Sequence, residues 1–101
     1  MSVTMALRIE VDPERFEQVT KENVDQLMAI VEQAKQRGLI HHEFYAGEGA
    51  VMAVDEWPDE QSFLGFYEAA GPQIGDLMGK AGVSSQPQPT FWRLLDTPDK
   101  V

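Results

Sequence analysis

The chain has 101 residues, of which 43% are hydrophobic and 25% are charged, as expected for one soluble globular domain with a modest core. Its formal net charge of −9 argues against nucleic acid and anionic membranes as partners, because both reward clustered lysine and arginine. The absence of cysteine excludes disulfides and thiolate chemistry. With no signal-peptide pattern and no apolar run near the ~18 residues of a membrane helix, we expect a cytoplasmic location.

The first part of the chain predicts one strand followed by a long helix. Apolar and polar residues alternate from Val3 to Val11, which is the period of a strand. Asp12 can cap the helix that follows, and apolar residues at helical spacing continue it to a stop at Gly38. A helix of about 25 residues would measure roughly 37 Å, too long for so small a domain. We therefore expect a break within Thr20–Asn23, with Asn23 capping a second helix.

The second part predicts a hairpin, another helix and a last strand. Residues 39–45 and 50–57 form the two strands around a Gly-Glu-Gly turn. Asp59 caps the next helix, which Gly71-Pro72 interrupts. The serine-, glutamine- and proline-rich residues 84–90 form an extended connector, and residues 90–97 form the final strand.

This order of elements predicts a single domain over residues 1–101. It is the β-α-β-β-α-β order of the ferredoxin-like α+β fold, an antiparallel sheet with both helices on one face.

Three segments strengthen this interpretation: "GLIHH" at the start of the second strand, "AVDEWPDEQSFLGF" and the terminal "PTFWRLL". Together with the order of elements they resemble the dimeric α/β-barrel superfamily, and within it small proteins of the antibiotic-biosynthesis-monooxygenase (ABM) type. The resemblance implies a homodimer packed sheet against sheet. It also implies a pocket between sheet and helices, lined by Trp57, for a small aromatic or polyketide-like metabolite.

The resemblance also bears on cofactors. Some members oxidise their ligand without a cofactor, others degrade haem, and many have no assigned activity. The haem-degrading members use an asparagine in the first strand and a histidine in the second helix. Here the first strand has no asparagine and the second helix has Tyr67 but no histidine. We therefore expect no cofactor.

His41 and His42 are adjacent in a predicted strand, so their side chains point to opposite faces and cannot bind one metal ion together. We predict no metal site. With Glu48 and Gly49 as the turn, His42 pairs with Asp55, and Trp57 lies on the same, more apolar face. With Gly47 and Glu48 as the turn, the pairs shift by two residues but the faces stay the same. An odd-length loop with a bulge would exchange the two histidines.

A histidine directly across from a carboxylate is a candidate general base, because the carboxylate fixes its tautomer and favours its protonated form. We predict that His42 is the base and that Asp55 orients it. The alternative is a satisfied polar pair inside the core.

Four further residues are candidate ligand contacts. Trp57 would stack on the ligand, Tyr67 would donate a hydrogen bond, and Phe44 shares their face. Arg8 would hold an anionic group, with Arg93 beside it if the first and last strands are neighbouring central strands. The alternatives are core packing for Tyr67 and, for Arg8, ion pairs with Glu10, Glu56 or Asp96.

The sheet face without helices should carry Leu39, Tyr45, Met52 and Val54. An exposed apolar face of this kind is unusual on a monomer, so we expect a second copy to cover it. The function predicted from sequence is a homodimer that binds an aromatic metabolite and could act as a cofactor-independent monooxygenase. The alternative is a non-catalytic ligand-binding or structural dimer.

Overall fold

The computed structural model describes residues 1–101, and its four strands and four helices alternate in pairs. In chain order they are β1 (Val3–Glu10), α1 (Pro13–Glu22), α2 (Val24–Gln36), β2 (His41–Gly47), β3 (Ala50–Trp57), α3 (Glu60–Ala69), α4 (Gly71–Ala81) and β4 (Pro89–Trp92). This is the predicted ferredoxin-like fold, with each of the two predicted helices divided in two.

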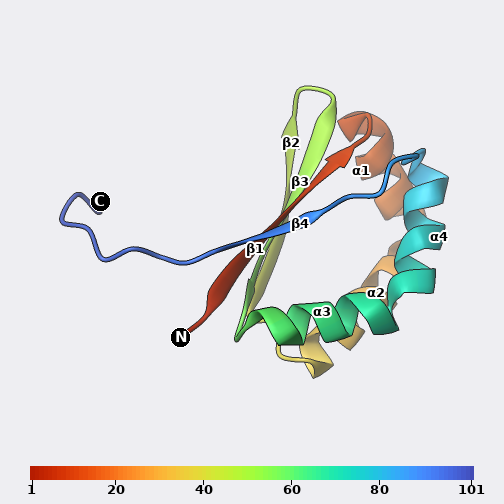
Figure 1. Ribbon diagram of the computed structural model, residues 1–101. Coiled ribbons are helices and arrows are strands. Elements are labelled where there is room, and N and C mark those ends of the chain that lie inside the picture. Colours follow the sequence, from red (N-terminus) through yellow and green to blue (C-terminus); the bar gives the residue numbers. More distant parts are fainter.

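The strands form one antiparallel sheet in the order β2-β3-β1-β4. All four helices lie against the same face of the sheet (Figure 1). In the β2–β3 hairpin the turn residues are Glu48 and Gly49, and Gly49 takes a φ of 68°, which glycine adopts without a steric penalty. The turn pairs Gly47 with Ala50, which is the first of the two predicted registers and confirms the predicted faces.

Both helix breaks lie at the predicted positions, but the first is built differently. Asn23 does not cap α2 with its side chain. Its Nδ2 instead donates to the carbonyl of Val19 at 2.9 Å, a group that the backbone N–H of Asn23 also contacts. At the second break Pro72 lies in the first turn of α4, where a helix has no use for the missing N–H.

The other two predicted caps differ. The carboxylate of Asp59 accepts a hydrogen bond from the backbone N–H of Ser62 at 2.8 Å, as expected for the start of α3. Asp12 makes no such bond, and α1 begins without a side-chain cap.

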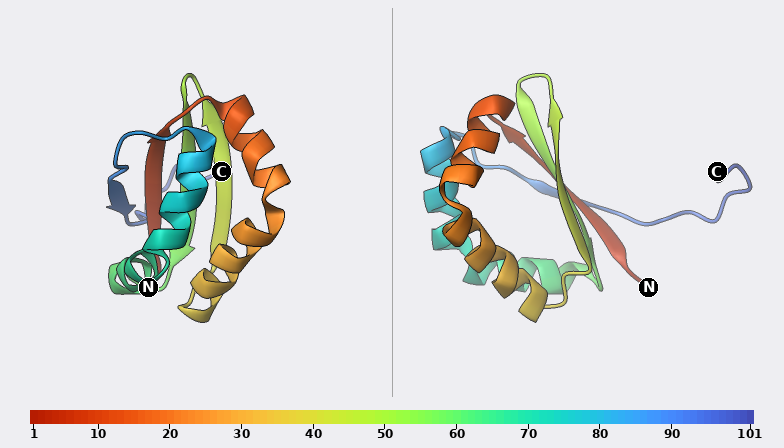
Figure 2. Two further views of the ribbon diagram at one scale, coloured as in Figure 1. Left: turned by 90° about the vertical axis from the view of Figure 1, so that its right-hand side faces the viewer. Right: turned by 180° about the vertical axis from the view of Figure 1, so that it is seen from behind.

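The helices curve around one side of the sheet (Figure 2), and the core fills the space between them. Trp57 at the end of β3 is fully buried. Its ring stacks on Phe66 at a centroid distance of 5.4 Å and meets Phe63 edge-on at 5.7 Å. These contacts fix the end of β3 against α3, and with it the position of Asp55 two residues earlier.

The start of β2 departs from the prediction. Gly38 takes a φ of 104°, and β2 begins only at His41. The chain therefore turns before the strand alternation starts. Leu39, expected on the open face, packs against the core instead, while Ile40 is 55% exposed.

β4 is shorter than predicted and lies at the edge of the sheet beside β1. Trp92 is its last residue and pairs with Thr4, so Arg93 lies beyond the sheet. The expectation of two arginines on neighbouring central strands is therefore corrected.

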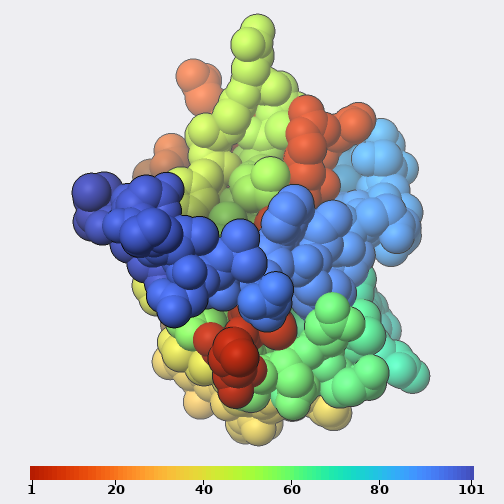
Figure 3. Space-filling view, turned by 60° about the vertical axis from the view of Figure 1, so that its left-hand side comes forward, coloured from red at the N-terminus to blue at the C-terminus, as the bar shows by residue number.

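No helices cover the other face of the sheet, and the segment after β4 runs away from the body of the molecule on that side (Figures 1 and 3). Trp92, Leu94 and Leu95 are 62%, 79% and 55% exposed.

None of the helices is long and apolar enough to span a membrane.

Candidate functional site

A partly open pocket of about 80 Å³, called here the inner cavity, lies between the helix-facing side of the sheet and the helices. Of the 18 residues that line it, 16 are hydrophobic. The two that are not are His42 and Asp55, from neighbouring strands. The polar chemistry of the cavity is therefore concentrated at one point of an otherwise apolar wall.

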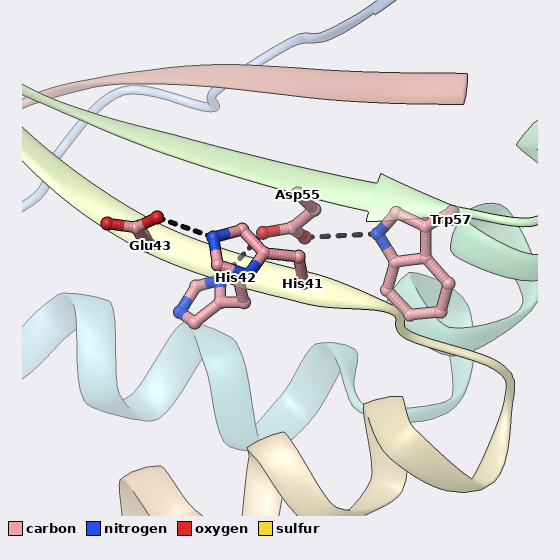
Figure 4. A network of polar contacts seen from close by, with 5 residues as sticks. All are labelled: His41, His42, Glu43, Asp55 and Trp57. Carbon is pink, nitrogen blue, oxygen red and sulfur yellow. Dashed lines mark hydrogen bonds and ion pairs between the residues drawn. The ribbon is translucent and has the colours of Figure 1, made fainter. Parts of the chain in front are cut away.

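His42, Asp55 and Trp57 form a chain of hydrogen bonds at this point (Figure 4). His42 Nδ1 lies 2.6 Å from Asp55 Oδ1, and the indole Nε1 of Trp57 donates to Asp55 Oδ2 at 3.1 Å. The side chain of His42 is 25% exposed and that of Asp55 is 8% exposed. Both oxygens of a buried carboxylate are thus engaged, one by each neighbour.

The bonding pattern determines which nitrogen of His42 is free to act. An indole nitrogen can only donate, and an ionised carboxylate can only accept. Asp55 therefore accepts from both neighbours, and His42 carries its proton on Nδ1. In the neutral ring Nε2 is then the unprotonated nitrogen, on the side of the ring away from Asp55. His42 also lines the inner cavity, so its ring borders that space.

Trp57 does not take the position expected of it. It is 0% exposed and is not among the residues that line the inner cavity. Its indole nitrogen donates to the second oxygen of Asp55, and its stacking on a ligand stays a prediction.

His41 points to the opposite face, as the alternation of the strand predicts. Its Nε2 contacts the carboxylate of Glu43, and both side chains are at least half exposed. No group of three or more His, Asp or Glu side chains is arranged to hold a metal ion.

Phe44 and Tyr67 both line the inner cavity. Phe44 meets the ring of His42 edge-on at 4.6 Å, which limits how far that ring can turn. Tyr67 stacks on Phe63 at 5.2 Å. Burial raises the pKa of the Tyr67 phenol above its ordinary value of 10.0, so the hydroxyl stays protonated and able to donate.

Arg8 lies on the open face of the sheet and does not line the inner cavity. Its side chain is 56% exposed, and its Nη1 lies 3.3 Å from Glu10 Oε1. The structure shows the alternative ion pair with Glu10, and the ligand contact of Arg8 stays a prediction.

The sequence did not single out the apolar wall of the inner cavity. Much of it comes from β1, α2 and α4, through residues such as Met5, Ile30, Leu39, Ile74, Leu77 and Met78. The periodicity that predicts these elements marks such positions as inward-facing, but it does not distinguish a residue that lines a cavity from one that fills the core.

No protein-family model matches the sequence, and no curated protein is similar enough in sequence to be matched. Solved structures with the same fold cover nearly the whole chain. The monooxygenase ActVA-Orf6 of Streptomyces coelicolor, solved in complex with nanaomycin D, is 16% identical with a TM-score of 0.66, covering 97% of this chain and 93% of its own. The cofactor-independent oxygenase SnoaB of Streptomyces nogalater is 16% identical with a TM-score of 0.63, covering 98% of both chains.

A dimeric ferredoxin-like protein from an uncultured marine organism is 14% identical with a TM-score of 0.65, covering 99% of this chain and 93% of its own. The chain therefore has the fold of ABM-type monooxygenases and of dimeric ferredoxin-like proteins, which confirms the fold-level resemblance.

Proposed function

We propose that this protein is a cofactor-independent monooxygenase in which His42 deprotonates an aromatic substrate bound in the inner cavity. The observation that carries the proposal is the buried hydrogen-bond chain from Trp57 through Asp55 to His42, which ends at an apolar cavity. A base fixed in one tautomer beside an apolar space suits proton abstraction, because the substrate is held away from competing water.

The proposed reaction needs no group beyond substrate and oxygen. Nε2 of His42 removes a proton from a ring-activated CH2 group, and the resulting carbanion, conjugated with the ring, transfers one electron to O2. The substrate radical and superoxide combine and, with a proton returned from His42, give a hydroperoxide. Loss of water from the hydroperoxide leaves a carbonyl. The CH2 becomes C=O, one oxygen atom enters the product and the other leaves as water.

Tyr67 and Asp55 have supporting roles in this proposal. The protonated phenol of Tyr67 donates a hydrogen bond to an oxygen on the substrate ring. Asp55 stabilises the imidazolium that forms when His42 accepts the proton, as a carboxylate beside a general base does.

Two of the similar structures are oxygenases and so support the proposal, but the proposal does not rest on them. SnoaB is a cofactor-independent oxygenase, and ActVA-Orf6 is a monooxygenase solved with nanaomycin D. At 16% identity these likenesses establish the fold only.

We propose further that the protein is a homodimer. No helix covers the face of the sheet opposite the helices, and the exposed Leu94 and Leu95 lie in the segment after the edge strand β4, which extends on that side (Figure 1). A second copy would cover both features through one two-fold contact. One of the similar structures is a dimeric ferredoxin-like protein.

The size of the inner cavity favours a second candidate function. Its 80 Å³ is less than the ~150 Å³ of a protein cavity known to admit benzene. A polyketide-sized molecule enters only if side chains move. A non-catalytic ligand-binding or structural dimer, in which the His42–Asp55 pair is a satisfied core contact, needs no such movement.

Oxygen uptake separates the two functions. The purified protein is mixed with a panel of anthrones and related ring-activated CH2 compounds, and O2 consumption is followed with an electrode. We expect turnover that falls about a hundredfold or more in His42→Gln, the usual size of a general-base contribution, and falls in Asp55→Asn. His41→Gln, which changes the neighbouring histidine on the other face, is the control and should keep full activity. Turnover that survives His42→Gln would overturn the role of this residue, and no turnover with any compound would favour the non-catalytic dimer.

A further inference from the structure

A second hollow, called here the outer groove, lies beside the inner cavity and has a volume of about 550 Å³. It is bordered by the end of α3, by α4, by β1 and by residues 83–87. Residues 83–87 belong to the segment that leads from α4 to β4, whose course Figure 2 shows. Its size is within the range of about 300–1,000 Å³ typical of small-molecule sites, whereas the inner cavity is far below it.

The inner cavity and the outer groove share a wall. Leu7, Ile9, Tyr67, Ile74 and Met78 line both spaces. Met78 has an unbranched side chain with three rotatable bonds, so it can change rotamer with little strain. A molecule too large for the inner cavity can therefore extend into the outer groove when these side chains move.

The two spaces differ in chemistry. The wall of the inner cavity is apolar except at His42, Asp55 and the phenol of Tyr67. Four polar residues, Ser84, Ser85, Gln86 and Glu68, line the outer groove, and no lysine or arginine lines it. Hydrogen-bonding groups that are neutral or positive are favoured there, and an anion meets a carboxylate without a compensating cation.

We propose that the outer groove is a second binding compartment, which takes the neutral or cationic polar end of an amphiphilic substrate whose aromatic end lies in the inner cavity. The placement of the aromatic end at His42 rests on the proposed function. The substrate class that follows is an aromatic compound with a hydroxylated, amide or amine-bearing substituent, and a free carboxylic acid at the same position is disfavoured.

Two glycines of α4 give a matched test of this proposal. Gly75 lines the outer groove, and Gly79, one turn later, does not. A Cβ added at either position meets no atom within 4 Å. Position 75 therefore has room for a Cβ at the groove, and leucine at position 79 makes the same change in the same helix outside it.

The experiment measures binding of para-substituted phenols by calorimetry. The long probe carries a six-carbon chain ending in a hydroxyl, and the short probe is para-cresol. We expect Gly75→Leu to weaken binding of the long probe roughly tenfold, equivalent to about 1.4 kcal/mol, and to leave para-cresol unchanged. Gly79→Leu should change neither. Equal effects of the two variants on the long probe, or no binding of the long probe to the wild type, would overturn the proposal.

A second arm tests the charge preference. The long probe ending in a carboxylate should bind about two- to fivefold more weakly than the hydroxyl probe, and Glu68→Gln should remove most of that difference. Glu60→Gln, on the same helix but outside the groove, is the control. Equal binding of the two probes would contradict the stated substrate class. If the probes bind as expected but no oxygen is consumed with any compound of the panel, the proposed reaction is wrong. The proposal that the outer groove is a binding compartment would still hold.

Discussion

Asp55 is the only charged residue in the buried interior, and each of its oxygens meets one donor. A carboxylate held from both sides has a single orientation, and so has the ring of His42 that binds it. We regard Trp57 as a positioning residue: it does not contact the inner cavity but determines where the base points.

The first prediction concerns this hydrogen bond. Trp57→Phe removes the indole N–H and leaves Asp55 Oδ2 without its donor, so the free energy of unfolding should fall by roughly 1–3 kcal/mol from the lost bond alone. In the wild type the Nδ1 proton of His42 should give a low-field signal in proton NMR, and in Trp57→Phe this signal should shift or disappear.

The control is Trp92→Phe, which removes an indole that donates to Thr90 Oγ1 at 2.9 Å from an exposed position. It should change neither the unfolding free energy nor the His42 signal. An unaltered His42 signal in Trp57→Phe would show that the tryptophan does not position the base.

The second prediction concerns Tyr67 and alkaline pH. Because burial raises the pKa of the phenol in the folded state, the unfolded chain loses this proton first as the pH rises. The stability that the neutral phenol contributes is complete below its ordinary value of 10.0 and is lost as the pH rises through the folded-state value. Tyr67→Phe lacks this loss.

Urea unfolding of both proteins measures the effect. The stability of the wild type relative to Tyr67→Phe should decrease between neutral pH and pH values above 10.0. A difference that stays constant over this range would mean that the phenol does not titrate with folding.

At the residue scale, the sequence predicted the cross-strand residue pairs but not the contacts that each side chain makes. His42 and Asp55 face each other because a two-residue turn fixes the register, and a turn can be read from its glycine. Trp57 was placed on the correct face. Whether its ring meets a ligand or packs behind Asp55 depends on side-chain torsions set by Phe63 and Phe66, which strand alternation does not determine.

The helices are where local signals proved most informative. Proline at the start of α4 and asparagine between α1 and α2 both mark real breaks. The predicted caps were less reliable, because a cap needs a side-chain rotamer as well as a residue type: Asp59 has the bond and Asp12 does not.

This contrast gives the third prediction. Asp59→Ala should lower the free energy of unfolding at neutral pH, while Asp12→Ala should lower it less. The backbone hydrogen bond from Ser62 lowers the pKa of Asp59 below 3.8, so its contribution is present above that pH and lost as the pH falls through the folded-state value. Thermal unfolding of the three proteins across this range is the measurement. Equal losses in both variants would contradict the assignment of the cap.

The last strand shows why sequence alone overestimates pairing. Residues 90–97 have strand-like composition, but β4 runs antiparallel to β1 and reaches its N-terminal end at the Thr4–Trp92 pair. Beyond that point the neighbouring strand has almost no chain left to pair with. Strand formation needs a partner as well as propensity, so the exposed remainder was not predictable from its own residues.

The whole molecule has two layers, because the helices cover one face of the sheet and leave the other face bare (Figure 1). The fold class could be predicted because the order of elements allows few arrangements. The volume of the inner cavity and the presence of the outer groove could not, because both depend on how helices and sheet curve past each other.

The fourth prediction is the oligomeric state. Light scattering at micromolar concentration should give twice the mass of one chain, and replacing Leu94 and Leu95 by aspartate should lower it toward one. Met28→Asp is the control, since Met28 is an equally apolar residue, 49% exposed, on the helical side. A wild-type mass of one chain would contradict the dimer.

Because Asp55 is buried, the residues of the site also contribute to the stability of the fold. If the chemistry were no longer needed, a single substitution at His42 or Trp57 would still leave Asp55 buried with an unmatched oxygen, at roughly 1–3 kcal/mol. Replacing the whole group by apolar residues of similar volume carries no such penalty and is often neutral or stabilising. Descendants of this chain should therefore keep the three side chains together or lose them together. The presence of all three in a relative would then reflect the stability of the fold as much as catalysis.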